Sequence, residues 1–159
     1  MEKWEGKVSS TVRGTRADEI WPLFKDFFNL HKWFPTLSTS YGIHGINGVP
    51  GCIRYCLGNS INATNSVSWS KERLIAVDEV NMSLSYEIVD SNIGFNSYVS
   101  TIRIIPVIAD TGNGCVIEWC FTVDPVQGLT FEDLLRKYQV GLHKMVKTMQ
   151  HSLHTEGSN

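Results

Sequence analysis

The sequence predicts an α+β fold in which a curved antiparallel sheet of about seven strands wraps around one long C-terminal helix. Two observations favour it. Apolar and polar residues alternate in several consecutive segments between residues 4 and 123, and apolar residues recur at intervals of three and four from Phe131 to Leu153. The strand-like segments follow one another across short turns without intervening helices, which excludes a parallel α/β sheet. The long helix must therefore lie across the concave face of the sheet.

The first 35 residues predict one strand and two short helices. Alternation from Trp4 to Val12 is typical of a half-buried strand, and Thr15–Asp18 is a helix start signal followed by apolar residues. The aromatic segment Phe27–Phe34 ends at Pro35. It is too short to be stable as an isolated helix, so we expect it to pack against a larger element.

Residues 38–123 predict an antiparallel meander. The turn Val49–Gly51 closes a hairpin, because proline and glycine favour tight turns. The expected strands after it cover 51–58, 66–78, 82–89, 98–105 and 116–123.

The last element is the clearest prediction. A helix of about six turns should begin near Thr130, where Thr130 and Asp133 form a capping pair, and end near Leu153. We expect 155–159 to be a loose tail and the whole chain, 1–159, to be a single domain.

Composition and charge narrow the classes of partner that we expect for the protein. Hydrophobic residues make up 42% of the 159 residues and the formal net charge is −2, so electrostatics give no reason to expect nucleic acid or an anionic membrane as partner. No run approaches the roughly 20 apolar residues of a membrane span. The N-terminus lacks the apolar core of a secretory signal, and we expect a soluble, cytoplasmic protein.

The cysteines and histidines predict neither a disulfide nor a metal site. Cys52 and Cys56 lie four residues apart on one expected strand, roughly 13 Å, which is too far to share a zinc ion or a bridge. Cys115 and Cys120 differ by an odd number and should point to opposite faces. His151 and His154 have helical metal-pair spacing without an evident third ligand. We therefore expect four reduced cysteines, no metal and no cofactor.

Several segments resemble a known family. Lys3–Lys7, Trp21–Lys32, Gly51–Tyr55 and Lys71–Leu74 resemble plant lachrymatory-factor synthase, a member of the START/Bet v 1-like superfamily of polyketide cyclase and lipid-transport proteins. The phrase KDFFNLHK, residues 25–32, is especially specific. The resemblance implies the helix-grip fold, with the two short helices as a lid over an apolar cavity that binds a small hydrophobic ligand.

The resemblance also implies a polar pair in that cavity. It matches the catalytic Arg and Glu of the synthase to Arg54 and Glu72, and Tyr98 joins them as a candidate catalytic residue. In that enzyme one group shuttles a proton and the other holds an oxyanion while an alkenyl sulfenic acid becomes a thial S-oxide. Alternation agrees for Glu72, which shares a face with Leu74. It disagrees for Arg54, which it places on the outer face with Cys52 and Cys56.

The remaining cavity residues are expected from alternation within the implied fold. They are Phe34, Leu84, Tyr86, Trp119, Phe121, Tyr138 and Leu142, with open space between Trp119 and the Tyr138 face of the helix. Without that fold, each is an ordinary core residue.

Two functions follow from these expectations: a ligand-binding protein of the lipid-transport type, or a cofactor-free isomerase resembling the synthase. Departures from the synthase pattern, such as Tyr138 in place of Trp and the dissimilar segment Leu57–Asn65, favour the first. The abscisic acid receptors resemble Glu72–Leu74 and Tyr98–Ile102 too. Their gate is replaced here by Asn59–Asn65 and their latch by Asn92–Phe95, so a receptor role is disfavoured. The sequence identifies no protein partner.

Overall fold

A single antiparallel sheet carries most of the described chain. The computed structural model describes residues 2–61, 67–109 and 112–156, and in these ranges seven strands are hydrogen-bonded in the order β1-β7-β6-β5-β4-β3-β2. The strands are β1 (Trp4–Arg13), β2 (Leu37–His44), β3 (Ile53–Ile61), β4 (Val67–Asp78), β5 (Ser83–Ser91), β6 (Val99–Ala109) and β7 (Gly112–Val123). The predicted meander is confirmed, and β1 joins it beside β7.

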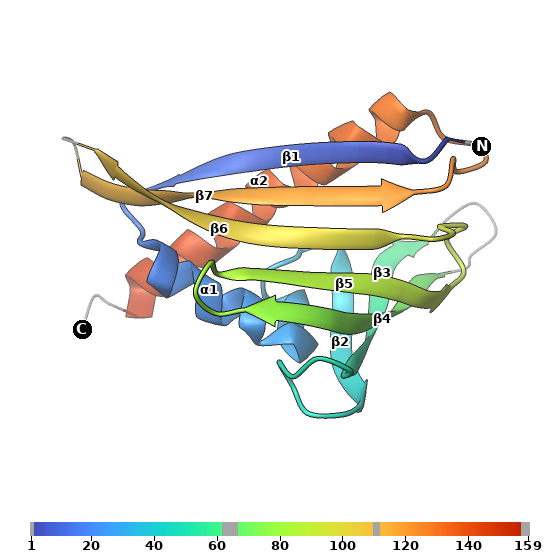
Figure 1. The fold of residues 1–159 in the computed structure, drawn as a ribbon, viewed down its shortest axis with the longest axis horizontal. Helices are drawn as coiled ribbons and strands as arrows, with labels where there is room; N and C mark the ends of the chain where they lie inside the picture. The colour runs from blue at the N-terminus through green and yellow to red at the C-terminus, as the bar shows by residue number, and fades with distance from the viewer. Residues whose placement is uncertain (1, 62–66, 110–111, 157–159) are drawn as a thin grey trace.

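The C-terminal helix α2 (Phe131–Glu156) lies across one face of this sheet. Strands β2 and β3 turn away from the direction of β1 and β7, so that the sheet curves around the helix (Figure 1). The residues of α2 that recur at three and four positions are fully buried, namely Leu134, Leu142, Met145 and Met149. In β1 every second residue is buried, as the alternation predicts. The core therefore lies between the helix and the concave face of the sheet.

Helix α2 begins as predicted and ends later than expected. The backbone N–H of Asp133 donates to the Thr130 hydroxyl at 3.1 Å, which is half of the predicted capping pair. The helix continues through Glu156, two residues into the segment expected to be a loose tail. Residues 157–159 lie outside the described residues.

Helices α1 (Ala17–Lys25) and η1 (Phe27–Lys32), the second a 3₁₀ helix, connect β1 to β2. The start of α1 agrees with the predicted signal, and the Arg16 backbone N–H donates to the Glu19 carboxylate at 2.8 Å. η1 packs on β2, where Gly42 leaves room for the ring of Phe28: a Cβ at Gly42 would lie 2.3 Å from a carbon of that ring. These two helices occupy the position predicted for the lid.

Neither a membrane span nor a metal cluster is found in the described ranges. No helix there is long and apolar enough to cross a membrane. The same ranges hold no group of three or more histidine, cysteine, aspartate or glutamate side chains placed to bind a metal ion.

Candidate ligand-binding site

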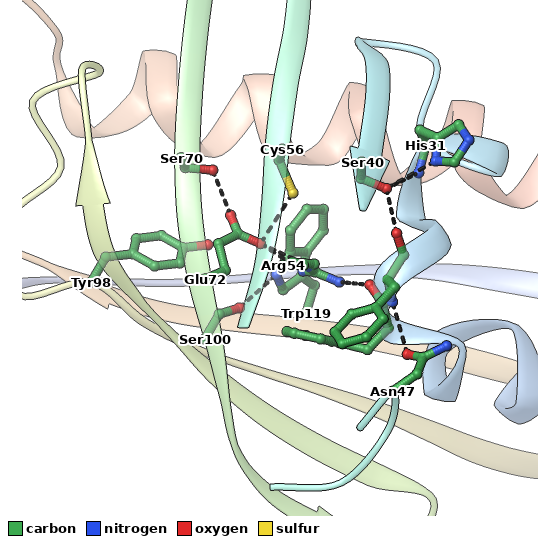
Figure 2. A network of polar contacts seen from close by, with 12 residues as sticks. His31, Ser40, Asn47, Arg54, Cys56, Ser70, Glu72, Tyr98, Ser100 and Trp119 are labelled. Carbon is green, nitrogen blue, oxygen red and sulfur yellow. Dashed lines mark hydrogen bonds and ion pairs between the residues drawn. The ribbon is translucent and has the colours of Figure 1, made fainter. Parts of the chain in front are cut away.

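Arg54 and Glu72 form a buried ion pair between β3 and β4. They are direct partners in the register of the two strands. The Arg54 Nε donates to Glu72 Oε1 at 2.8 Å, and its Nη2 lies 2.7 Å from the same oxygen (Figure 2). The Arg54 side chain is 3% exposed and that of Glu72 12%, so the pair is shielded from water at both ends. A charge-assisted contact of this geometry holds both side chains in one orientation.

Arg54 faces the interior, which the alternation argument did not predict. That argument correctly grouped Arg54 with Cys52 and Cys56, but it assigned their face to solvent. All three are buried, whereas Ile53 and Tyr55 on the other face are only partly buried. The apolar residues could face outward because aromatic rings of β2 and β4 pack against Tyr55 on that face. The inward direction implied by the family resemblance is the observed one.

The guanidinium of Arg54 is enclosed by η1 and β5. Its Nη1 donates to the Phe27 carbonyl at 3.0 Å. The ring of Phe27 lies 3.8 Å from the guanidinium carbon and that of Tyr86 4.9 Å, both within cation–π range. Each of its three nitrogens therefore already has an acceptor. Arg54 thus links the lid helix to the carboxylate of Glu72.

Hydrogen bonds to β2 and to the β2–β3 turn hold η1 close to Arg54. The Ser40 hydroxyl on β2 donates to the Phe28 carbonyl at 2.8 Å and accepts from the His31 backbone N–H at 3.1 Å. Asn47, in the β2–β3 turn, accepts from the Phe28 backbone N–H at 2.9 Å. Figure 2 shows these contacts on one side of Arg54, with the carboxylate of Glu72 on the other.

Glu72 has further donors on each of its oxygens. The Ser70 hydroxyl donates to Oε2 at 3.0 Å, and the Cys56 thiol, 3.7 Å away, donates to Oε1. Burial, reinforced by the neighbouring carboxylate, raises the pKa of the Cys56 thiol far above its ordinary range, so it remains a thiol. The carboxylate is thus fixed from three sides, and Oε2 carries fewer contacts than Oε1.

The third candidate catalytic residue, Tyr98, faces this carboxylate. Tyr98 immediately precedes β6, and Figure 2 shows its hydroxyl pointing toward Glu72. The Tyr138 hydroxyl on α2 donates to the Tyr98 oxygen at 2.8 Å. Burial raises the pKa of both tyrosines well above 10, so both are neutral at physiological pH.

The predicted cavity residues come together as an aromatic cluster. The Tyr138 ring centroid lies 4.6 Å from those of both Trp119 and Phe121, and Phe34 is 6.0 Å from Trp119. The expected open space between Trp119 and the Tyr138 face is therefore wrong, because these rings are in direct contact. The other expected lining residues, Leu84, Tyr86 and Leu142, are buried in the same core.

Three polar residues of the site were missed by sequence reasoning. Ser70 and Cys56 bind the Glu72 carboxylate, and Ser100 accepts a 2.6 Å hydrogen bond from the Trp119 indole. Ser70 stands two residues before Glu72, so its position on the same strand face could have been derived from alternation. Cys56 required the register of β3 against β4, which the sequence does not supply.

The two cysteines of β7 lie on opposite faces of the strand. Cys115 is buried and Cys120 is half-buried, as opposite faces of β7 require, and all four cysteines are free thiols.

A hollow of about 240 Å³ lies on the β5–β6 connection, lined by Ile88–Ser91 and Gly94–Ser97. Neither Arg54 nor Glu72 lines it, although Ile88 is the cross-strand partner of Glu72. Residues 62–65 of the segment expected to replace the receptor gate lie outside the described ranges.

Comparison with known proteins assigns the family. A model of the polyketide cyclase / dehydrase and lipid transport family matches residues 3–150. The chain belongs to this START/Bet v 1-like family. Among solved structures, major latex-like protein 151 from Panax ginseng has a TM-score of 0.71 at 16% identity, covering 94% of this chain and 97% of that one. XoxI from Bacillus cereus has a TM-score of 0.68 at 18% identity over both full chains.

A third similar structure, from Bacillus thuringiensis, has a TM-score of 0.69 at 21% identity, covering 92% of this chain and 99% of that one. These identities establish the fold alone. The helix-grip architecture predicted from the sequence is confirmed, and similar folds come from both a plant and bacteria. The membership in a lipid-transport family makes the interface between α2 and the sheet the place to consider for a ligand.

Proposed function

We propose that the protein binds a small hydrophobic ligand between α2 and the concave face of the sheet, with the polar end of the ligand beside Glu72. The observation that carries this proposal is the buried Arg54–Glu72 pair at the edge of an aromatic cluster. A charged pair adds little stability over apolar packing, because the desolvation of both groups offsets their attraction. Its presence in the core of a lipid-transport family member is therefore better explained by a polar ligand group.

The ligand needs room that the aromatic cluster occupies in this structure. Tyr138 on α2 and Phe34 after η1 contact Trp119 from the side opposite the sheet. Movement of α2 or of the η1 segment would separate these rings and admit an elongated apolar molecule. The Trp119 indole would then report binding, since its aromatic neighbours change.

Native mass spectrometry of protein purified from its source tests the proposal. We expect a mass above that of the chain, from a small molecule that organic extraction releases and that is apolar with one polar end. An alkyl probe series with tryptophan fluorescence is the second measurement. A bare chain in every preparation, together with no response to any alkyl probe, would contradict the proposal.

A second candidate function is favoured by one observation, the fixed carboxylate of Glu72. Its Oε1 is held by Arg54 and its Oε2 by Ser70, which is the kind of positioning that a proton-shuttling base requires. In this alternative the protein is a cofactor-free isomerase that resembles lachrymatory-factor synthase, with Tyr98 as a proton donor beside Glu72. Arg54 would stabilise the developing oxyanion once it is released from part of its present contacts.

The isomerase alternative is tested with a freshly generated alkenyl sulfenic acid, followed for thial S-oxide. Glu72→Gln keeps the shape of the side chain and removes the base, so the rate should fall about 10²–10⁴-fold. Glu87→Gln, which removes a surface carboxylate on β5, is the matched control and should leave the rate unchanged. If wild-type protein does not accelerate the reaction over buffer, the isomerase alternative is wrong and the ligand-binding proposal stands.

The cytoplasmic location and the single-domain organisation remain predictions.

A further inference from the structure

The cationic side chain at the polar end of the proposed site already has hydrogen-bond acceptors. Among the described residues, Arg54 is the only buried basic side chain. All three of its nitrogens have acceptors, two on Glu72 and one on the Phe27 carbonyl. The rings of Phe27 and Tyr86 lie against the guanidinium. An incoming anion would therefore have to compete with these acceptors for a side chain that is already paired with Glu72.

The more accessible member of the pair is the acceptor. The Glu72 side chain is 12% exposed against 3% for Arg54. Its Oε2 accepts a hydrogen bond from Ser70, and a carboxylate oxygen can accept more than one. The polar group that this oxygen offers to a ligand is thus a hydrogen-bond acceptor.

Tyr98 supplies the complementary donor. Its oxygen accepts from the Tyr138 hydroxyl at 2.8 Å. Its other polar neighbour, Ser100, already donates its own proton to the Cys120 carbonyl, so the Tyr98 proton can be donated to Ser100 or to a ligand. Figure 2 shows the Tyr98 hydroxyl pointing toward the carboxyl group of Glu72, whose two oxygens face Ser70 and Cys56. A group placed between them meets one donor and one acceptor.

We propose that this site selects a neutral ligand hydroxyl, which donates to Glu72 Oε2 and accepts from Tyr98, and that it rejects a carboxylate. This inference rests on the proposed ligand-binding function and specifies the class of ligand. A hydroxyl matches both partners because it donates and accepts at once. The Arg54–Glu72 pair has a formal charge of zero, so a carboxylate buried there would have no unpaired cation and would face a like charge.

Three probes with the same alkyl chain test this selectivity by calorimetry at pH 7.5: 1-decanol, methyl decanoate and decanoate. Decanol should bind at least about tenfold more tightly than decanoate, because only decanoate brings an unpaired charge into the core. Methyl decanoate, which is neutral but cannot donate, should bind more weakly than decanol.

Two variants examine the partners separately. Tyr98→Phe should weaken decanol about 3–10-fold, the effect of one hydrogen bond. Tyr41→Phe, the matched control, removes an exposed hydroxyl on the outer face of β2 and should leave decanol affinity unchanged. Glu72→Gln leaves Arg54 with an uncompensated charge and should reverse the preference in favour of decanoate. If that variant does not fold, the probe series and Tyr98→Phe still decide the question.

The possible outcomes separate the two proposals. Decanoate binding as tightly as decanol to the wild-type protein would overturn the hydroxyl selectivity and leave ligand binding intact. Equal effects of Tyr98→Phe and Tyr41→Phe would overturn the role of Tyr98. The absence of binding by all three probes would contradict the proposed function itself, and with it this inference.

Discussion

Breaking the Arg54–Glu72 pair should destabilise the protein in a way that depends on which partner is removed. Glu72→Gln leaves a guanidinium that is 3% exposed and meets only neutral acceptors, the Phe27 carbonyl and the new amide oxygen, with no counter-charge. A guanidinium cannot lose its charge by deprotonation in a protein. Removing one partner of a buried pair costs about 3–5 kcal/mol of unfolding free energy, and this loss should be the same at pH 7.5 and pH 5.5.

Arg54→Met leaves the opposite charge in a less enclosed position. The Glu72 side chain is 12% exposed against 3% for Arg54, and in this variant it keeps the hydrogen bonds from Ser70 and Cys56. The loss of unfolding free energy should therefore be smaller than for Glu72→Gln, about 1–3 kcal/mol at pH 7.5.

Urea unfolding followed by tryptophan fluorescence measures these differences. The double variant Arg54→Met/Glu72→Gln should be at least about 2 kcal/mol more stable than Glu72→Gln alone, since no buried charge remains. The exposed pair Arg73–Glu87, 3.1 Å apart, is the control, and its loss should cost less than about 1 kcal/mol. A Glu72→Gln variant within 1 kcal/mol of wild type, or recovered at low pH, would refute this reasoning.

Two further predictions concern packing and pH. Gly42→Ala should lower the unfolding free energy by about 1–3 kcal/mol, because the new Cβ meets the Phe28 ring, and adding Phe28→Leu should restore part of the loss in the same urea assay. The raised pKa values of Tyr98 and Tyr138 favour the protonated hydroxyls in the folded state, so their contribution is complete below pH 10 and is lost above it. Between pH 8 and pH 10.5 in reducing buffer, the free energy of unfolding should fall by at least about 2 kcal/mol, because the raised pKa of the buried Cys56 thiol acts in the same direction. Equal stability at both pH values would contradict the burial of these groups.

The periodicity of apolar residues predicted where the helices and strands lie, but it did not predict which face of β3 is buried. The spacing of apolar residues located α2 and the meander, because one face of each element must be buried whatever its partner is. In β3 the more apolar residues, Ile53 and Tyr55, lie on the outer face. There they pack against neighbouring aromatic rings, while Arg54 and two cysteines turn inward. The rule that apolar side chains point into the core fails here, because aromatic side chains of the neighbouring strands also cover the outer face of β3.

The candidate site depended on contacts that single strands do not encode. Alternation along β4 placed Glu72 inward together with Leu74, and both are buried. The alternation does not continue to Ala76, which is exposed, because the pairing with β5 shifts register between Leu74 and Ala76. Ser70 lies on the same strand face as Glu72, but the donors Arg54 and Cys56 come from β3 and followed only from the pairing of the two strands.

The contacts around Arg54 connect the proposed ligand-binding site to the position of η1. Arg54 holds Glu72 with two of its nitrogens and the Phe27 carbonyl with the third, and the Phe27 ring lies 3.8 Å from the guanidinium carbon. A ligand group that draws Glu72 toward itself alters the same guanidinium that holds the first residue of η1. Phe28 of η1 also accepts a hydrogen bond from Ser40 and donates one to Asn47, and neither of these residues belongs to the ion pair. The helix therefore stays attached while its contact with Arg54 changes. The ion pair is thus placed to couple the polar end of a ligand to the segment that covers it.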